Sequence, residues 1–561
     1  MPDAGVPASE RTGGGPMAHL RDAAVLLVVI AAPAAFYVLD LGRHSDDWWF
    51  YRHMLSGRDR SWSGLYETLA SVPWLAVRPG QVAWYATFQT WLPSDITAVH
   101  IANHVAFALG ALLLHAALRA MPALRGAAYP VTLLYVSMPH FSAAKFWYAN
   151  HMATLSFALF AAAALASASL AREPRRRVAA ALVGLVGLST AASNLCYELF
   201  GFMLPLLPLL AWLANGRSLR EAAGDRRFRA STLAAGLAFA ATTLFKMGFQ
   251  HGVSSPSGLS DLFHFAARSA WLYLRVAYTT FWTLGLYSPR AAGGIAMGPY
   301  FEPAAVHAAL LALALMVARL VAAGRMQPDA TAGREARWPF LVVAGIVAFG
   351  LGYLPFLVNF WADAYPWGEV NRVNIGGALG AALVICGALR WLEGRSRPAA
   401  QAVLLLFCAT GIFLQVATGR MWVRAAERQD AVVAAVLAAA GDLRAGDTVL
   451  IYGLCPYLGP AAVLRSPDDT GPRLMIASGG RILAADLIQP DTRLTSSEIN
   501  TNHHDRLKGH YPYRSLVVVD LPRRTATRIE SYSEASAFFA AHPIRDAAGC
   551  SYVRGRGTPL Y

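Results

Sequence analysis

Long apolar runs alternate with short polar segments along most of this chain. The runs lie at about 23–41, 98–118, 127–141, 152–171, 178–194, 196–214, 230–249, 303–323, 338–360, 374–393 and 400–417. A helix needs about 20 apolar residues to cross the roughly 30 Å hydrocarbon core of a bilayer. The pattern therefore predicts an all-α polytopic membrane bundle with about eleven transmembrane helices.

Three other segments depart from this pattern. Residues 1–20 are rich in Gly and Pro, which predicts a disordered N-terminus on the cytoplasmic side. Residues 271–290 combine many aromatics with Arg275 and Arg290, a composition typical of an interfacial or re-entrant helix that does not cross fully. Residues 425–561 are mixed in polarity and long enough for a small domain.

The last segment is predicted to fold as an α/β domain. Residues 447–454 and 514–521 are apolar and β-branched, as strands are, whereas 431–443 and 533–541 have helical periodicity. Asp468-Asp469 followed by Thr470-Gly471-Pro472 is typical of a turn. We therefore expect a transmembrane domain over 21–424 and an α/β domain over 425–561.

Composition and charge support a membrane protein. Of the 561 residues, 56% are hydrophobic and 15% are charged, against about 25% charged in soluble domains. The net charge of +14 comes almost entirely from arginine, which gathers between apolar runs at 172–177, 217–229, 325–337 and 390–397. No basic stripe with interleaved aromatics lies on a soluble module, so nucleic-acid binding is not expected. Disordered, fibrous and ordinary soluble proteins are excluded.

The arginine-rich loops predict the orientation, since cytoplasmic loops retain positive charge. They agree with one another only if the N-terminus is cytoplasmic and the segment 271–290 does not cross fully. Eleven spans then place the C-terminal domain outside. The expected location is a bacterial inner membrane, with a long first outer loop over 42–97. Cys455 and Cys550 would then meet oxidising conditions, and the spacing leaves a disulfide and two free thiols equally open.

The strongest local signal follows the first apolar run, where His44-Ser45-Asp46-Asp47-Trp48 opens an aromatic stretch. Carboxylates at a membrane surface cost desolvation energy unless they are paired or used. One interpretation is an acid/base or metal-ligating site, with the aromatic residues at the entrance of a lipid-facing cavity. The other is a solvated turn followed by an aromatic belt.

Later motifs favour the first interpretation. Arg78-Pro79, Pro139-His140 with Trp147, and Tyr197-Glu198 follow the acidic pair in order. This order resembles the GT-C class of membrane glycosyltransferases, which includes the protein O-mannosyltransferases and the lipid A aminoarabinose transferases. The resemblance covers about residues 20–215. A lysine or similar residue is usual where this chain has Tyr197, so no role is carried over to that tyrosine.

The resemblance implies transfer of a sugar from a polyprenyl-phosphate donor to a glycan, a lipid-linked saccharide or a protein at the outer face of the bilayer. Asp46 or Asp47 would be the general base, which typically contributes about 10²–10⁴-fold to the rate. Cationic residues on the outer side would bind the donor phosphate, because Arg and Lys stabilise phosphate charge. These candidates are Arg78, Lys145, Lys246, Arg268, Arg275 and Arg372. The remaining site candidates are His44, Trp48, His140 and Glu198.

Structural roles stay open for several of these residues. Arg372 could simply pair with Glu369 or Asp363. Lys246 could reach the headgroups, and Glu198 could make a structural hydrogen bond. No metal-ligating set is assigned, although the resemblance leaves room for a divalent cation, Mg²⁺ or Mn²⁺.

Two rival functions remain. A membrane transporter would have charged residues at the bilayer midplane and a sequence repeat between its two halves, and both signals are weak here. A non-catalytic polysaccharide assembly or export factor with an outer sensor domain would tolerate replacement of Asp46 and Asp47.

Overall fold

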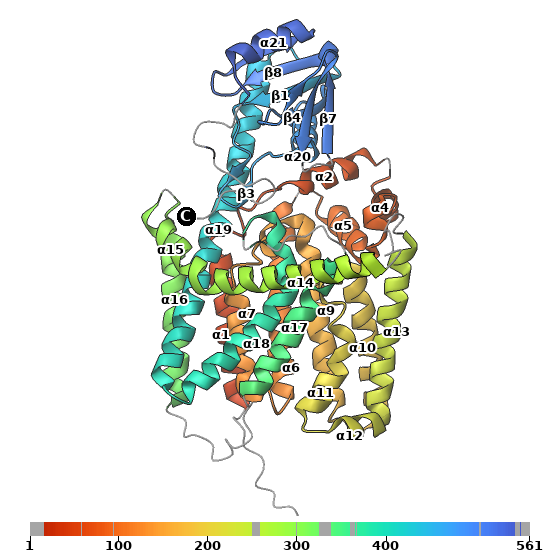
Figure 1. Cartoon of the computed structure of the whole chain (residues 1–561), viewed down its shortest axis with the longest axis vertical. Coiled ribbons are helices and arrows are strands. Elements are labelled where there is room, and N and C mark those ends of the chain that lie inside the picture. The colour runs from red at the N-terminus through yellow and green to blue at the C-terminus, as the bar shows by residue number, and fades with distance from the viewer. Residues whose placement is uncertain are drawn as a thin grey trace, which may run out of the picture.

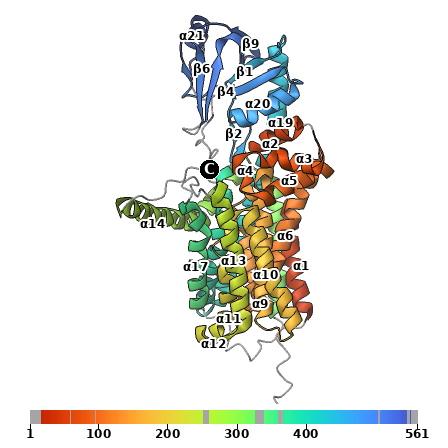
Figure 2. The same ribbon diagram turned by 90° about the vertical axis from the view of Figure 1, so that its right-hand side faces the viewer.

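A bundle of long helices carries a smaller α/β domain at one end (Figures 1 and 2). The computed structural model describes residues 16–57, 59–93, 95–249, 259–298, 300–324, 338–358, 365, 367–503, 507–544 and 550. The predicted disorder of residues 1–20 falls mostly outside these ranges. The first described helix, α1 (Pro16–Ala34), begins at Pro16.

Eight helices in the described ranges are long and apolar enough to cross a membrane. They are α6 (Ile96–Ala120), α9 (His151–Leu170), α10 (Arg176–Cys196), α13 (Arg226–Phe249), α16 (Pro303–Gly324), α17 (Trp338–Val358), α18 (Asn374–Glu393) and α19 (Arg397–Ala440). Each coincides with a predicted apolar run. Leu233, Leu237 and Leu244 of α13 are 61–66% exposed, as expected for side chains that face lipid. The protein is a multi-pass integral membrane protein.

The other three apolar runs form shorter or broken elements. α1 has 19 residues with Pro33 near its end, and α7 (Ala128–Ser137) has only 10, after the 3₁₀ turn η1 (Arg125–Ala127). The run 196–214 is split into two 3₁₀ turns, η3 (Glu198–Phe200) and η4 (Leu204–Leu206), and the short helix α11 (Leu207–Ala214). Proline lacks the N–H that a helix interior needs, and Pro205 and Pro208 lie at this break. The prediction of about eleven crossings is therefore confirmed only for eight.

One long helix lies across the bundle instead of along it. α14 (Leu259–Trp282) runs roughly perpendicular to the long helices in both views (Figures 1 and 2). Its Trp271, Leu274 and Tyr278 are 66–67% exposed and share one face. A π-helical turn, η5 (Thr283–Tyr287), and α15 (Ser288–Met297) follow it. The segment 271–290 expected at the interface thus covers the second half of α14, η5 and the start of α15, and its position at a membrane interface stays a prediction.

The first loop folds into four helices at the end of the bundle that bears the α/β domain, which we call the capped end (Figure 1). They are α2 (Asp46–Ser56), α3 (Trp62–Ala70), α4 (Pro73–Ala76) and α5 (Pro79–Trp91). Phe50, Leu69, Leu75 and Tyr85 are at most 1% exposed and form their shared core with Phe146. Two short elements of the next loop, α8 (Ala143–Phe146) and η2 (Tyr148–Asn150), lie against it. At the opposite end, α12 (Leu219–Gly224) joins α11 to α13.

The C-terminal domain is built on a four-stranded sheet of order β4-β1-β8-β9. β1 (Asp447–Tyr452) pairs in parallel with β4 (Ile482–Leu487) and β8 (Leu516–Asp520), and β9 (Thr525–Ile529) is antiparallel at the edge. Val449 is opposite both Ala485 and Val517. The predicted strands at 447–454 and 514–521 are thereby confirmed. Further strands pair as β2 (Tyr457–Leu458) with β3 (Ala461–Ala462), and as β5 (Arg493–Leu494), β6 (Glu498–His503) and β7 (Leu507–Pro512), before the 3₁₀ turn η8 (Tyr513–Ser515).

The helices of this domain partly differ from expectation. The predicted helix 533–541 is confirmed as α21 (Tyr532–Ala541), but 431–443 belongs to α19, a single helix of 44 residues that begins in the bundle. Val432 and Val436 of α19 pack into the domain core with Leu474. The boundary expected near residue 425 therefore falls inside a continuous helix.

The turn expected at Asp468–Pro472 is wrong. These residues belong to α20 (Pro467–Ala477), because Ser466 and Asp469 form a capping box and Pro467 occupies the first turn. Cys455 and Cys550 form a disulfide, which decides the alternative that the sequence left open.

Candidate functional site

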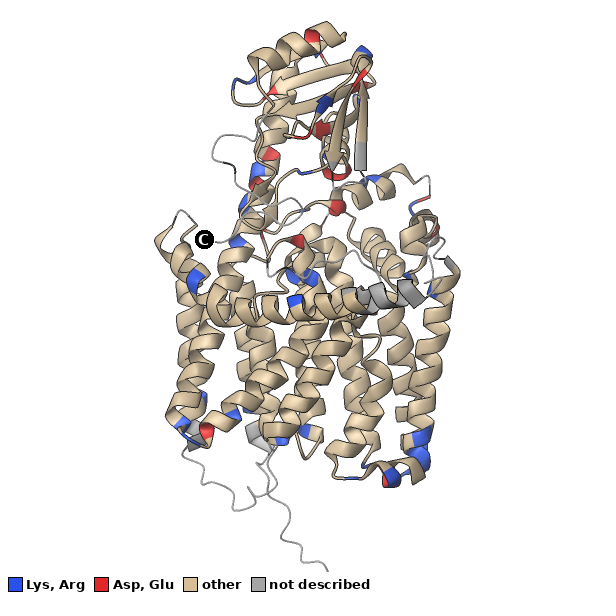
Figure 3. Ribbon diagram, viewed as in Figure 1, with Lys and Arg blue, Asp and Glu red and all other residues tan. Residues whose placement is uncertain are grey.

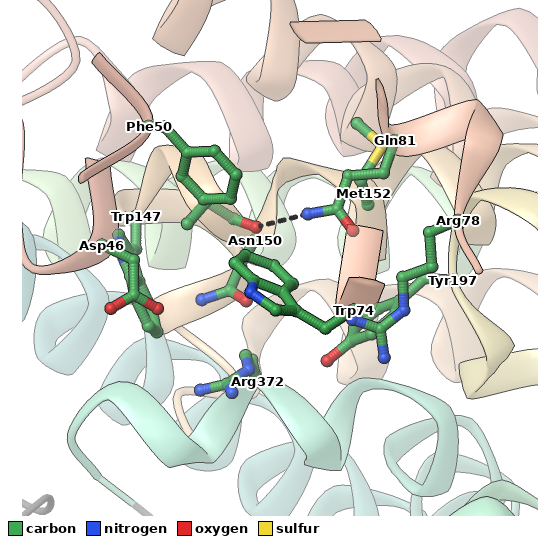
Figure 4. A pocket seen from close by; sticks show the side chains of 11 residues that line it. Asp46, Phe50, Trp74, Arg78, Gln81, Trp147, Asn150, Met152, Tyr197 and Arg372 are labelled. Atoms are coloured by element: carbon green, nitrogen blue, oxygen red, sulfur yellow. Dashed lines mark hydrogen bonds between the residues drawn. The ribbon is translucent and has the colours of Figure 1, made fainter. Parts of the chain in front are cut away.

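A cavity of about 60 Å³ lies at the capped end, below the C-terminal domain. Four parts of the chain line it: the first loop, residues 147–152, the residue after α10, and η7 (Glu369–Val373). Its lining residues are Asp46, Phe50, Trp74, Arg78, Gln81, Trp147, Ala149, Asn150, Met152, Tyr197 and Arg372. In Figure 4, Asp46 lies at one side and Arg78 at the other, with Asn150 and Arg372 between them.

The two adjacent aspartates have different environments. Asp46 lines the cavity and its side chain is 39% exposed, so it is accessible to a ligand. Asp47 is fully buried, and its two carboxylate oxygens accept hydrogen bonds from the backbone N–H groups of His44 and Ala149, each at 2.8 Å. Burial raises the pKa of Asp47 well above its ordinary value. Asp46 can therefore meet a substrate, whereas Asp47 joins two loops.

Arg78 reaches the cavity because of how α5 begins. Pro79 occupies the first position of α5, where its missing N–H costs nothing, and Arg78 is the residue before it. A Cβ on Gly80 would lie 2.7 Å from Cys196 Sγ, so only glycine lets α5 pack this closely against the end of α10. This contact brings Arg78 to Glu198.

Glu198 joins two of the predicted phosphate-binding residues. Arg78 donates to it at 2.5 and 3.3 Å, and the Lys246 ammonium lies 2.8 Å from Glu198 Oε2. The Arg78 guanidinium also lies over the Tyr197 ring, 4.5 Å from its centroid. Two cations thus share one carboxylate, which leaves this edge of the cavity with a net positive charge.

Arg372 presents a second guanidinium to the cavity. It lies 5.1 Å from the centroid of the Trp147 ring, and its Nη1 donates to the carbonyl oxygen of Glu369 at 3.0 Å. Its buried Nε has no hydrogen-bond partner. Asn150 Nδ2 and Gln81 Oε1 also line the cavity region as buried atoms without partners. Because such atoms are costly unless they are bonded, they are suited to a polar ligand.

The C-terminal domain contributes an arginine next to this cavity. Arg465 Nη2 lies 2.9 Å from Glu369 Oε2 and 3.7 Å from Asp46 Oδ1. Burial alone would lower the pKa of Arg465, but the neighbouring Glu369 carboxylate raises it above the ordinary value. Arg465 was not singled out from the sequence, because nothing in its local motif distinguishes it from the other arginines.

Three of the six predicted phosphate-binding residues are elsewhere or cannot be placed. Lys145 is 3% exposed, donates to Gln415 Oε1 at 2.7 Å and does not line the cavity, and burial lowers its pKa to about 7. Arg275 of α14 donates to the Tyr365 hydroxyl. Arg268 also falls on α14, but its side chain is outside the described part of the structure.

Three of the other candidates are packed near the site but contribute no side chain to the cavity wall. His44 packs edge-on against Trp422, and burial lowers its pKa to about 4, so it is neutral. Trp48 Nε1 donates to Gln429 Oε1 at 2.8 Å, which links α2 to α19. His140 is buried, and its carbonyl oxygen accepts from Asn374 at 2.7 Å. None of the three lines the cavity.

Trp74 and Gln81 line the cavity and were missed as site residues by the sequence reasoning. Both belong to the first loop, and the only available signal was their position between the acidic pair and the end of that loop. Across the described residues, no three His, Cys, Asp or Glu side chains gather as a metal site. No known protein family, curated protein or solved structure matches this chain.

Proposed function

We propose that the protein is a membrane glycosyltransferase of the GT-C type, which moves a sugar from a polyprenyl-phosphate donor to an acceptor hydroxyl. The observation that carries this proposal is the cavity at the capped end, where the exposed Asp46 carboxylate stands apart from the cations Arg372 and Arg78 (Figure 4). An acid/base group and a phosphate-binding group are the two parts that such a transfer needs.

In the proposed reaction, the acceptor oxygen attacks the anomeric carbon while the bond from that carbon to the phosphate oxygen breaks. Asp46 takes the proton from the acceptor hydroxyl. The polyprenyl phosphate leaves as an anion, and the guanidinium groups of Arg372 and Arg78 stabilise its charge. The unpartnered Asn150 Nδ2 and Gln81 Oε1 would supply hydrogen bonds to the sugar hydroxyls.

The walls of the cavity are partly aromatic. Trp74, Trp147 and Phe50 supply aromatic surface at its walls, and the lipid tail would extend along the exposed apolar helices into the bilayer.

We further propose that the capped end faces away from the cytoplasm. The Cys455–Cys550 disulfide supports this orientation, because disulfides persist in oxidising compartments. Figure 3 supports it as well: Lys and Arg gather at the opposite end, around α12 and the turn between α18 and α19. Positive charge of this kind is retained in cytoplasmic loops.

The test uses the full-length protein in lipid nanodiscs and a panel of polyprenyl-phosphate hexoses as probes, with release of polyprenyl phosphate as the readout. Asp46→Asn removes the base and should lower turnover about 10²-fold or more. Asp95→Asn is the matched control, since Asp95 is an exposed aspartate that caps α6 and lies outside the cavity lining. Its turnover should stay near that of the unmodified protein.

Donor binding is tested separately with undecaprenyl phosphate. Arg372→Ala should weaken binding at least tenfold, because a charge-assisted contact to the phosphate is lost. Arg420→Ala is the control, since Arg420 pairs with Asp40 at 3.2 Å and does not line the cavity. The proposal fails if no probe is bound or turned over, or if Asp46→Asn retains turnover within threefold. Failure would favour the assembly-factor interpretation.

A further inference from the structure

Arg465 connects the C-terminal domain to both sides of the cavity. It lies between β3 and α20, 420 positions from Ser45, yet its Nε and Nη2 donate to Ser45 Oγ at 3.1 and 2.7 Å. The same Nη2 contacts Glu369 Oε2 at 2.9 Å. Arg465 itself does not line the cavity, so it would act through these neighbours.

Ser45 has a backbone conformation that needs support. Its φ is +49°, in a region that residues other than glycine rarely adopt. Because Ser45 directly precedes the acidic pair, its backbone sets the direction in which the pair enters α2. In this conformation Asp46 reaches the cavity and Asp47 reaches the amides of His44 and Ala149.

Glu369 extends the connection to the phosphate-binding side. Its carboxylate pairs with Arg465, while its carbonyl oxygen accepts a hydrogen bond from Arg372. Glu369 is 3% exposed, and a buried carboxylate is costly unless a cation is next to it. One guanidinium therefore joins the side of the cavity that holds Asp46 to the side that holds Arg372.

The domain holds Arg465 rigidly. Asp469 accepts hydrogen bonds from the backbone N–H groups of Arg465 at 3.0–3.1 Å and of Ser466 at 2.9 Å. Gln489 donates to the Arg465 carbonyl oxygen at 3.2 Å. The backbone of Arg465 is thus fixed from both sides before its side chain leaves the domain.

We propose that Arg465 is a positioning residue for the cavity, and that the C-terminal domain completes the site by supplying it. The inference rests on the proposed transferase function for its kinetic test. Arg465 orients Asp46 through Ser45 and holds the Glu369–Arg372 segment in place. The domain is then part of the site and more than an accessory to it.

The kinetic test is a double-mutant cycle in the full-length protein in nanodiscs, with the polyprenyl-phosphate hexose that is turned over as the probe. Arg465→Gln should lower kcat about tenfold or more, since small displacements of a reacting group are costly. It should also raise the donor KM, because the segment that carries Arg372 loses its support. Since Arg465 acts on kcat through Asp46, adding Arg465→Gln to Asp46→Asn should lower kcat at saturating donor by no more than about threefold further. Independent, multiplying losses would overturn the proposal.

Two further variants separate positioning from simple folding. Arg465→Lys keeps the positive charge beside Glu369 but loses the planar set of guanidinium donors. The turnover of this variant should be at least threefold faster than that of Arg465→Gln. Arg473→Gln is the matched control. Arg473 also ties α20 to its surroundings, 2.5 Å from Asp430 Oδ1 and over the Trp48 ring at 4.3 Å, but it touches neither Ser45 nor Glu369. Its kcat should stay within threefold of the unmodified protein, and a tenfold loss there would overturn the proposal.

Hydrogen exchange tests the same contacts without any substrate. Arg465→Gln should speed amide exchange at least tenfold in both 43–47 and 368–373, whereas Arg473→Gln should leave 368–373 unchanged. Unchanged exchange in Arg465→Gln overturns the proposal. If no probe is turned over, the proposed transferase function fails, and this exchange pattern alone decides whether Arg465 positions the two segments.

Discussion

Replacement of Asp47 by alanine should loosen the first loop without removing any group from the cavity. Two backbone N–H groups, those of His44 and Ala149, donate to its carboxylate at 2.8 Å each. Each such hydrogen bond contributes a net stabilisation of about 1–1.5 kcal/mol. Their loss should therefore lower the local free energy of opening by about 2–3 kcal/mol, with both donors left buried and unpartnered.

Hydrogen exchange measures this quantity at the donors themselves. A loss of about 2–3 kcal/mol corresponds to about 30- to 150-fold faster exchange, since 1.4 kcal/mol is a factor of ten. Peptides that contain the His44 and Ala149 amides should show this acceleration in Asp47→Ala. Asp46→Ala is the control, because the Asp46 side chain accepts nothing from these amides.

The result that would refute this reasoning is equal exchange of the two amides in Asp46→Ala and Asp47→Ala. Such a result would mean that the two aspartates do not divide into a cavity residue and a loop-joining residue. The assignment of Asp46 as the base would then lose its structural support, whatever the effect on turnover.

Three other outcomes are expected. Replacing Cys455 and Cys550 together by serine opens a loop with a sequence separation of 95 residues and should destabilise the C-terminal domain by about 4 kcal/mol, measured by thermal unfolding. A bidentate contact with Arg528 lowers the pKa of Asp447, so its contribution to stability is present above about pH 4 and is lost as the pH falls below that value. Asp447→Asn should therefore destabilise the domain at pH 7, and its difference from the unmodified protein should vanish in acid unfolding experiments. A reporter fused after Tyr561 should be active only if it works outside the cytoplasm, and cytoplasmic activity would contradict the proposed orientation.

The sequence predicted the parts of the fold that depend on local composition. The eight long helices follow from apolar runs near 20 residues, and the strands β1 and β8 follow from β-branched runs. The break in 196–214 was missed because its mean apolarity hides the effect of Pro205 and Pro208. The continuity of α19 was missed because the change from apolar to polar residues in its middle resembles a domain boundary. In the structure the helix continues through this stretch, and its polar residues make tertiary contacts, such as that of Gln429 with Trp48.

The candidate site was predicted only as a set of residue types. The acidic pair, Arg78 and Glu198 were named from their order, and Arg372 from its predicted position on the outer side. The structure brings these residues together at or beside the cavity. Which of the two aspartates faces the cavity and which joins the loops could not be predicted. It depends on the φ angle of Ser45, and the residue that bonds the Ser45 side chain is 420 positions away.

The unbroken course of α19 has a consequence for how the chain can change in length. Its 44 residues extend about 66 Å, from the bundle, where Trp422 packs on His44, to the core of the C-terminal domain at Val432. Inserting one residue between Trp422 and Val432 would turn the domain by about 100°, and inserting seven would restore its heading but raise it about 10 Å. Neither change would keep Arg465 beside Ser45. This stretch of helix can therefore accept substitutions on its exposed face, but its number of residues is fixed.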